Sequence, residues 1–274
     1  MIKIYRNSLE LGFKQFVFSG GEVSIKLNTT PRFFQNIGNI TLLARVQNSD
    51  DLVALGMVKD AIMNEFRQFY SDLQPPPIDV IIPYWPGARQ DRYCDRGESF
   101  SAKVYANLIN SLKFNTVTII DPHSGVTPAL IDNVRVISQL DVINKDQEFI
   151  KRVMTGNNVF IAPDAGSNKK VSEIAKFFNR ESFVRADKLR DLTNGNIKET
   201  IVYCEDFNGD DVIIADDLCE NGGTFLGLSK VLKEKNCGKI VLYVTHGLFP
   251  KGVDHIFNGG IDEIWCTDSF LTNT

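Results

Sequence analysis

Short runs of apolar, mostly β-branched residues alternate along this chain with longer segments in which apolar residues recur every three or four positions. The short runs lie at 80–82, 117–120, 159–161, 212–214 and 240–244. Continuous apolar runs of this length are typical of parallel strands that are covered on both faces. We therefore predict a buried strand at each run.

Between these runs the apolar residues follow the helical repeat. One stripe contains Leu55, Val58, Ile62, Phe66 and Phe69, a second Val171, Ile174, Ala175 and Phe178, and a third Phe225, Leu228 and Leu232. Such stripes usually face a protein core, so they predict amphipathic helices without indicating a function. An alternating order of strands and helices predicts a parallel sheet with right-handed crossovers.

The start of the chain has a different pattern. Residues 13–18 and 23–27 read as two strands, and Ser19-Gly20-Gly21-Glu22 between them is a hairpin signal. Further on, a strand, an acid-bearing loop and a helical pattern follow one another near 117–125 and again near 211–225. This recurrence predicts two similar α/β halves that meet near residue 138.

Composition narrows the function classes. The chain has 274 residues with 43% hydrophobic and 23% charged residues, which is typical of a globular protein. A net charge of −4, from 30 basic and 34 acidic residues, argues against a nucleic-acid partner. Five scattered cysteines without CxxC spacing indicate a reducing compartment. Without an apolar leader or a run of about 18 apolar residues, we expect a cytoplasmic protein with no membrane partner.

The strongest chemical signal follows the run at 212–214. Asp216 and Asp217 stand where a buried strand ends, and ligands of open α/β sheets bind at that edge, where carboxylates can accept hydrogen bonds from sugar hydroxyls. Gly222 and Gly223 permit close approach of a phosphate, which the amides of the next helix and the hydroxyl of Thr224 would face. The plain alternative is a strand that ends in a capped helix, with Asp and Gly serving the turn.

This loop, Asp216-Asp217-Leu218-Cys219-Glu220-Asn221-Gly222-Gly223-Thr224, resembles the phosphoribosyl-diphosphate (PRPP) loop of type I phosphoribosyltransferases and of ribose-phosphate pyrophosphokinases. A second segment separates the two families. Pro83-Tyr84-Trp85-Pro86-Gly87-Ala88-Arg89-Gln90-Asp91-Arg92 resembles the PY…ARQDR segment of the pyrophosphokinases, which has no counterpart in the transferases. Similar segments occur in the family's order from about residue 13 to 269, so the chain resembles a ribose-phosphate pyrophosphokinase.

The resemblance assigns an ATP site. In the family the ARQDR segment helps to hold ATP, which implies that role for Arg89, Gln90 and Asp91. A guanidinium can donate two hydrogen bonds to a phosphate, and a carboxamide can form hydrogen bonds with the edge of an adenine ring. Asp121-Pro122-His123-Ser124 and Ala162-Pro163-Asp164 resemble two Mg²⁺–ATP segments, which implies His123 and Asp164 as metal ligands, His123 also contacting ATP. Because Mg²⁺ prefers oxygen ligands, the alternative for His123 is a contact with an ATP phosphate.

The hairpin Phe18-Ser19-Gly20-Gly21-Glu22 resembles the family's FSDGE hairpin, although Gly20 stands where the family has an acid. In the family this hairpin covers the adenine of a neighbouring subunit's ATP. The resemblance therefore implies that Phe18 and Glu22 bind ATP across subunits of a homo-oligomer. An ordinary hairpin without a ligand is the alternative.

Asp187-Lys188-Leu189-Arg190 resembles the family's mobile catalytic segment, which implies that Lys188 and Arg190 stabilise the transferring group; a polar stretch at 192–196 follows, as a closing flap needs. For ribose 5-phosphate the resemblance implies contacts from Asp216, Asp217, Glu220, Asn221, Gly222, Gly223 and Thr224. Glu220 and Asn221 stand where the family's loop has Asp and Thr.

Together these assignments imply an α/β protein of two similar domains of the phosphoribosyltransferase type I kind, each with a mainly parallel sheet flanked by helices. Residues 1–138 would bind ATP and residues 139–274 ribose 5-phosphate. The implied activity is Mg²⁺-dependent transfer of the diphosphate of ATP to the C1 hydroxyl of ribose 5-phosphate, giving PRPP and AMP. A transferase that consumes PRPP and a catalytically silent regulatory subunit are the alternatives.

Overall fold

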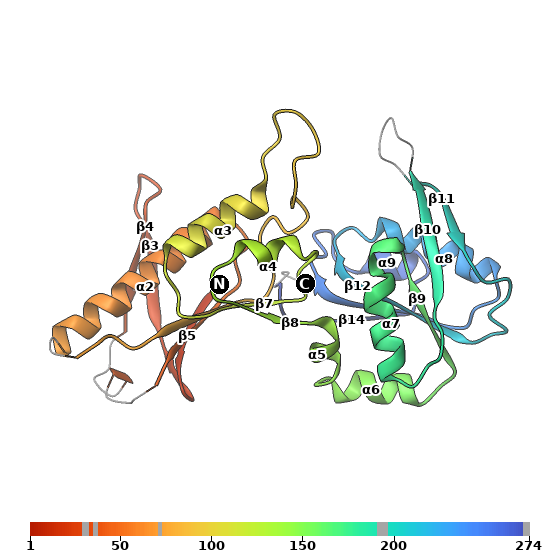
Figure 1. Ribbon diagram of the computed structural model, residues 1–274, viewed down its shortest axis with the longest axis horizontal. Coiled ribbons are helices and arrows are strands. Elements are labelled where there is room, and N and C mark those ends of the chain that lie inside the picture. Colours follow the sequence, from red (N-terminus) through yellow and green to blue (C-terminus); the bar gives the residue numbers. More distant parts are fainter. Residues whose placement is uncertain (29–32, 35–37, 71–72, 191–196, 271–274) are drawn as a thin grey trace. The chain divides into compact units, whose positions relative to one another are not determined.

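The computed structural model describes residues 1–28, 33–34, 38–70, 73–190 and 197–270, and within these ranges the side chains of 189–190 and 197–198 stay undescribed. The chain divides into two compact units, Met1–Ile137 and Ser138–Thr274 (Figure 1). Each unit has its own sheet and its own apolar core. We therefore describe each unit by itself.

The sheet of the first unit has, among the described residues, the strand order β2-β1-β5-β6-β7-β8. Its strands are β1 (Ile2–Arg6), β2 (Leu9–Leu11), β5 (Ile40–Ala44), β6 (Ile78–Ile82), β7 (Val117–Ile120) and β8 (Val134–Ile137). The pairs from β5 to β8 are parallel, and β1 is antiparallel to both β2 and β5. A separate antiparallel hairpin joins β3 (Phe13–Val17) and β4 (Val23–Leu27), as predicted.

Helices of the first unit are α2 (Ser49–Phe69), α3 (Ser101–Ser111) and α4 (Val126–Leu130). Asn48 begins α2 by accepting a hydrogen bond from the backbone of Asp51, a standard N-cap. The predicted stripe from Leu55 to Phe66 is buried against the sheet. The prediction that Phe69 belongs to this stripe is wrong: its side chain is 57% exposed because α2 ends there.

The sheet of the second unit has, in the part of the chain that is described, the order β11-β10-β9-β12-β13-β14. Its strands are β9 (Asn158–Ala162), β10 (Val184–Arg190), β11 (Ile197–Val202), β12 (Asp211–Cys219), β13 (Ile240–Gly247) and β14 (Glu263–Cys266). All neighbouring strands from β10 to β14 are parallel, and only β11 runs antiparallel. The helices are α5 (Gln139–Ile143), α6 (Gln147–Met154), η1 (Ala165–Ser167), α7 (Asn168–Phe177), α8 (Gly223–Glu234) and α9 (Asp254–Asn258).

Both faces of this sheet are covered. Val212 and Ile214 of β12 share one core with residues of α8 and α9, whereas Ile213 and Ala215 share a second core with residues of α5, α6 and α7 (Figure 1). Because successive strand residues point to opposite faces, a continuous apolar run is what a strand between two helix layers requires. The apolar part of β12 is thus buried between two helix layers, whereas its polar end, with Asp216 and Asp217, can contact a ligand.

The predicted fold class is confirmed: each unit has a mainly parallel sheet flanked by helices. The predicted strands at 80–82, 117–120, 159–161, 212–214 and 240–244 all lie inside observed ones. The sequence analysis did not predict β1, β2, β5, β8, β10, β11 or β14, in each of which polar residues accompany the apolar ones. Among the described residues, no helix is long and apolar enough to cross a membrane.

Candidate functional site

The carboxyl end of β12 projects beyond its neighbour. Its pairing with β9 ends at Ile214–Ile161, whereas its pairing with β13 continues to Cys219–Gly247. Asp216 and Asp217 therefore belong to β12, and the loop predicted to begin at Asp216 begins instead at Glu220. The ladder between β12 and β9 thus ends before the acidic pair is reached. This edge of the sheet is where open α/β folds bind ligands.

Lys188 and Asp164 meet at the same edge. Asp164 lies two residues after the end of β9, and Lys188 lies on β10, the strand parallel to β9. The Nζ of Lys188 is 2.9 Å from Oδ2 of Asp164, and the Lys188 side chain is only 8% exposed. The other carboxylate oxygen of Asp164 accepts the N–H of Ser167 at 3.1 Å, which caps η1. Burial works to raise the pKa of Asp164, but the hydrogen bond and charge of Lys188 outweigh it and hold that pKa below its usual value.

Asp216 and Asp217 behave as a coupled pair. Burial raises the pKa of Asp216 well above its usual value, and the charge of Asp217 and a hydrogen bond between the two carboxyl groups raise it further. The N–H of Asp217 also donates to Oδ1 of Asp216 at 2.9 Å. Two carboxylates this close do not both ionise readily, and both can form hydrogen bonds with sugar hydroxyls. Asp164 adds a further negative charge near Asp216.

The loop after β12 leads into α8 through a left-handed turn. Gly222 has φ +71 and ψ 0, and a Cβ there would lie 3.1 Å from Ile256, so both backbone and packing require glycine. Among the described residues no side chain caps α8, and its first residue, Gly223, is exposed. Uncapped amides at a helix N-terminus are the groups that bind phosphate in other proteins.

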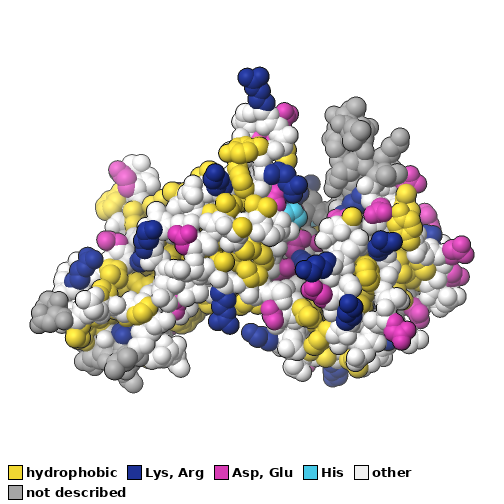
Figure 2. All heavy atoms as spheres, in the orientation of Figure 1, with side chains coloured by type: hydrophobic (Ala, Val, Ile, Leu, Met, Phe, Trp, Pro, Cys, Tyr) yellow, Lys and Arg dark blue, Asp and Glu magenta, His cyan; other side chains and the backbone are white. Residues whose placement is uncertain are grey.

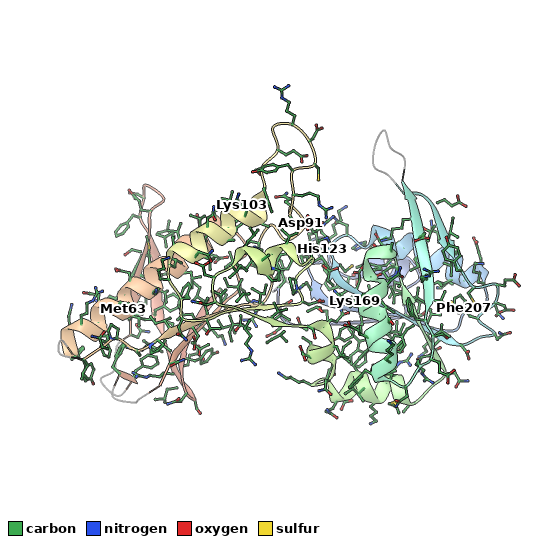
Figure 3. All side chains as sticks on the ribbon, viewed as in Figure 1. Met63, Asp91, Lys103, His123, Lys169 and Phe207 are labelled. Atoms are coloured by element: carbon green, nitrogen blue, oxygen red, sulfur yellow. The ribbon has the colours of Figure 1, made fainter. Side chains whose placement is uncertain are left out.

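The first unit brings together two of the predicted ATP segments. Oδ2 of Asp91 accepts the hydroxyl of Ser124 at 2.6 Å, and Oδ1 accepts Nε of Arg92 at 2.8 Å. Burial works to raise the pKa of Asp91, but these hydrogen bonds and the nearby charges of Arg92 and His123 outweigh it and lower that pKa. Figure 3 shows Asp91 and His123 near each other. Asp91 is only 3% exposed, and its hydrogen bond with Ser124 joins the two segments. A contact from Asp91 to ATP stays a prediction.

The remaining predicted ATP residues of these segments face solvent. Arg89, Gln90 and His123 are all exposed, where a nucleotide has access to them. Asp121, directly after β7, has a left-handed backbone with φ +38. A non-glycine residue in this region is uncommon, and such conformations concentrate at functional sites. The roles of Arg89, Gln90 and His123 in ATP binding stay predictions.

The β3–β4 hairpin carries Phe18 and Glu22 at its turn. The N–H of Phe18 donates to the carbonyl of Glu22 at 2.9 Å, and Gly21 has φ +89. Phe16, Val17 and Phe18 are 44%, 65% and 60% exposed, and Figure 2 shows apolar side chains at the free end of this hairpin. Exposed neighbouring apolar side chains are typical of a binding surface. Phe18 and Glu22 therefore stay candidates for ATP binding.

Arg190 is the one predicted catalytic residue whose side chain falls outside the described residues, although its backbone pairs with Ile197 across β10 and β11. The predicted flap at 192–196 also lies outside them. Lys188, Asp164, Asp216 and Asp217 are thus brought together in the second unit. Arg89, Gln90, Asp91 and His123 are brought together in the first.

The donor set of the second unit fits Mg²⁺ carried on a nucleotide. No group of three or more His, Cys, Asp or Glu side chains that could hold a metal occurs within the ranges described. Mg²⁺ is commonly bound through one or two carboxylates together with substrate phosphates and water, which needs no such cage. Asp164, with a lowered pKa and a side chain that is 40% exposed, offers a charged oxygen for this purpose. The exposed imidazole of His123 is better suited to a phosphate oxygen.

Several residues that shape the site were not predicted. Gln139 is buried, and its amide nitrogen donates to the backbone carbonyl of Asp216 and, at 3.1 Å, to Thr245. Nε2 of His255 lies 3.1 Å from the carbonyl of Asn221. These contacts join residues 77 and 34 positions apart, so no spacing along the chain could have indicated them.

Comparisons with known proteins fit the two-unit arrangement. No protein-family model matches the chain. A ribose-phosphate pyrophosphokinase from Aquifex aeolicus is 27% identical over 254 residues, covering 92% of this chain and 77% of that protein. Proteins with the same name from Shewanella oneidensis (28% identity; 92% and 76% covered) and Sulfolobus acidocaldarius (28%; 74% and 69% covered) are also similar.

A solved structure described as phosphoribosylpyrophosphate synthetase from Mycobacterium smegmatis superposes with a TM-score of 0.77. The superposition covers 95% of this chain and 81% of that structure at 18% sequence identity, and it therefore supports the fold. The resemblance that the motifs indicated is confirmed: over most of its length this chain is similar to ribose-phosphate pyrophosphokinases.

Proposed function

We propose that this chain is a ribose-phosphate diphosphokinase, which transfers the diphosphate of ATP to the C1 hydroxyl of ribose 5-phosphate to give PRPP and AMP. One observation carries the proposal: similarity to a single class of named pyrophosphokinases extends over 92% of the chain and so includes both units. A transferase that consumes PRPP would account for the loop at 220–224 but would leave the first unit's Pro83–Arg92 segment without a role.

In the proposed reaction the C1 hydroxyl of ribose 5-phosphate releases its proton, and its oxygen forms a bond to the β-phosphorus of ATP. The bond between that phosphorus and the oxygen bridging it to the α-phosphate breaks, and AMP leaves with the bridging oxygen. Such transfers depend mainly on positioning and on neutralising negative charge. Mg²⁺ would supply part of that neutralisation, with Asp164 proposed as a metal ligand of the second unit and His123 proposed as a contact to ATP in the first.

The chain's own residues then have distinct tasks. Lys188, and Arg190 with it, would stabilise the charge that develops on the β-phosphate and on the leaving AMP. Asp216 and Asp217 would hold the ribose hydroxyls, while Glu220 to Thr224 would hold the 5-phosphate. Arg89, Gln90 and Asp91 would hold ATP, and Phe18 and Glu22 would cover the adenine in a neighbouring copy of a homo-oligomer.

Release of AMP from ATP tests this function. AMP should form only when ribose 5-phosphate is present, together with an equal amount of PRPP, in a reaction that needs Mg²⁺. Formation of a nucleotide from PRPP and a free base would favour the transferase. Absence of both activities, in a protein that binds ATP, would favour a silent regulatory subunit.

A further inference from the structure

One peptide group in the loop between β12 and α8 is held at both ends by side chains. The carbonyl oxygen of Asn221 accepts a hydrogen bond from Nε2 of His255 at 3.1 Å, because a carbonyl can only accept. The N–H of the next residue, Gly222, is directed at the thiol of Cys219, where it lowers the pKa of that thiol against the larger opposite effect of burial. A peptide group is planar, so fixing its C=O and its N–H fixes the orientation of the whole group.

The loop needs such a restraint because it turns on glycine. Gly222 adopts φ +71, and glycine exchanges easily between positive and negative φ. Its own carbonyl accepts the N–H of Leu226 at 2.9 Å, the first hydrogen bond of α8. A rotation of the 221–222 peptide would break the contact with His255 and disturb this helix start. Holding that peptide therefore fixes the backbone from which the amides of Gly223 and Thr224 continue into α8.

Cys219 and His255 are both held in place by the surrounding structure. Cys219 is fully buried, and its own carbonyl accepts the N–H of Leu248 at 2.8 Å. Burial raises the pKa of the Cys219 thiol to about 12, so this acceptor stays neutral and does not repel a phosphate. Next to His255, Ile256 packs against Gly222. The end of α9 is tied to α8 by the hydroxyl of Ser229, which donates to the carbonyl of Gly259 at 2.8 Å.

We propose that Cys219 and His255 are positioning residues for a sugar phosphate: they lock the Asn221–Gly222 peptide so that the start of α8 is preorganised for the phosphate group. The ligand class rests on the proposed function, whereas the clamp itself rests on these contacts. Neither residue touches the substrate. Their loss should therefore weaken binding of the phosphate and leave the chemical step nearly unchanged.

Two near-isosteric variants of His255 provide the central test. In His255→Gln the amide nitrogen lies close to the place of Nε2 and can still donate to Asn221. In His255→Asn the amide is one carbon shorter and cannot reach it. We expect His255→Asn to weaken binding of ribose 5-phosphate about tenfold, which corresponds to the loss of roughly one hydrogen bond. His255→Gln should bind ribose 5-phosphate with an affinity within about twofold of the parent's. Calorimetric titration with ribose 5-phosphate, and with ribose as the phosphate-free probe, measures this.

The kinetic pattern adds a second readout. KM for ribose 5-phosphate should rise in His255→Asn while kcat and KM for ATP stay near the parent values. Phe257→Ala, which removes an exposed side chain of the same helix, is the control and should change neither. Cys219→Ser keeps an acceptor for Gly222 and should resemble the parent, whereas Cys219→Ala should resemble His255→Asn. Because both residues hold one peptide, the effects of Cys219→Ala and His255→Asn should not add.

The outcomes separate the clamp from the function. A parent protein that binds ribose 5-phosphate while His255→Asn and Cys219→Ala bind it equally well overturns the clamp but leaves the function intact. Equal losses for ribose and ribose 5-phosphate, or equal losses in His255→Gln and His255→Asn, also overturn it. If the parent binds no ribose 5-phosphate and makes no AMP, both the proposed function and this assignment fail.

Discussion

The ammonium group of Lys188 lies 2.9 Å from a carboxylate oxygen of Asp164, so a predicted catalytic residue and a predicted metal ligand are partners in one ion pair. The two belong to neighbouring parallel strands, β10 and the segment that follows β9. Lys188 is nearly buried, whereas Asp164 is 40% exposed and open to a competing cation. In the proposed function Asp164 would hold Mg²⁺ and Lys188 would contact the transferring phosphate, so each side chain would exchange this ion pair for a contact with its ligand.

The first prediction concerns turnover. Replacing Lys188 with Met removes the charge but keeps most of the side-chain volume, and we expect kcat to fall by at least about 10²-fold, as for other transition-state charge contacts. Arg190→Ala should act in the same direction. Lys169→Ala, at an exposed lysine of α7, is the matched control and should be fully active (Figure 3). AMP release measures the effect, and normal turnover in Lys188→Met would remove this lysine from the mechanism.

The second prediction is a dependence of stability on pH. The pKa of Asp164 is lowered in the folded chain, mainly by Lys188 acting against burial, so its stabilising contribution is complete above the unfolded pKa of about 3.9. That contribution is lost as the pH falls through the folded value. Thermal unfolding of the parent and of Lys188→Met should therefore differ by a constant amount above about pH 4, and by less below it. A difference that stays constant down to the acid transition would contradict the ion pair.

How much of this site the sequence could predict depends on how far apart the interacting residues lie. Asp216 and the glycines of the 220–224 loop are contiguous, so one strand-to-helix pattern placed them at a sheet edge. Asp164 and Lys188 were predicted as separate motifs, and their ion pair spans 24 residues. It exists because β9 and β10 are adjacent, a topology that local periodicity does not specify.

Local patterns also failed where half-buried segments adopt regular structure. The strand β1 alternates buried and half-buried positions with Arg6 and Lys3 among them, so it lacks the continuous apolar run that marked the central strands. Arg6 is nonetheless buried, because its guanidinium donates to the carbonyls of Phe33 and Phe34. Such partners lie about 27 residues away and cannot be inferred from composition.

The third prediction concerns the acidic pair. Because the folded pKa of Asp216 is raised by burial and by Asp217, the unfolded chain releases this proton at a lower pH than the folded chain, and folding stability falls as the pH rises between the two values. Asp216→Asn removes the carboxyl group and with it this loss of folding stability at higher pH. We expect its unfolding temperature to exceed the parent's by a few degrees at neutral pH, with ribose 5-phosphate binding weakened at least about tenfold. Calorimetry at several pH values would show the gain shrink toward acid; an unfolding temperature below the parent's at neutral pH contradicts it.

The fourth prediction concerns the link between the two ATP segments. Ser124→Ala leaves a buried carboxylate oxygen of Asp91 without its 2.6 Å donor, which should cost about 1–3 kcal/mol of stability. The segments at 83–92 and 121–124 would then be less well aligned, so KM for ATP should rise while KM for ribose 5-phosphate stays unchanged. Ser111→Ala is the control, because that exposed hydroxyl donates to the carbonyl of Leu108 within its own helix. Unaltered stability and an unaltered KM for ATP would mean that Asp91 does not depend on Ser124.

The fifth prediction tests whether the β3–β4 hairpin serves a neighbouring copy of the chain. Phe18 is 60% exposed beside two other exposed apolar residues, which suits a surface that covers a ligand or a partner. Phe18→Ala should raise KM for ATP, whereas Phe69→Ala, at an equally exposed ring on α2, should not. If the hairpin completes the site of another subunit, co-expressed Phe18→Ala and Lys188→Ala chains with different tags should form mixed oligomers. Random pairing would then restore roughly a quarter of the sites, each with an intact hairpin from one chain and an intact lysine from the other. Copurified oligomers whose AMP release does not exceed that of the separate variants would show that each chain uses its own hairpin.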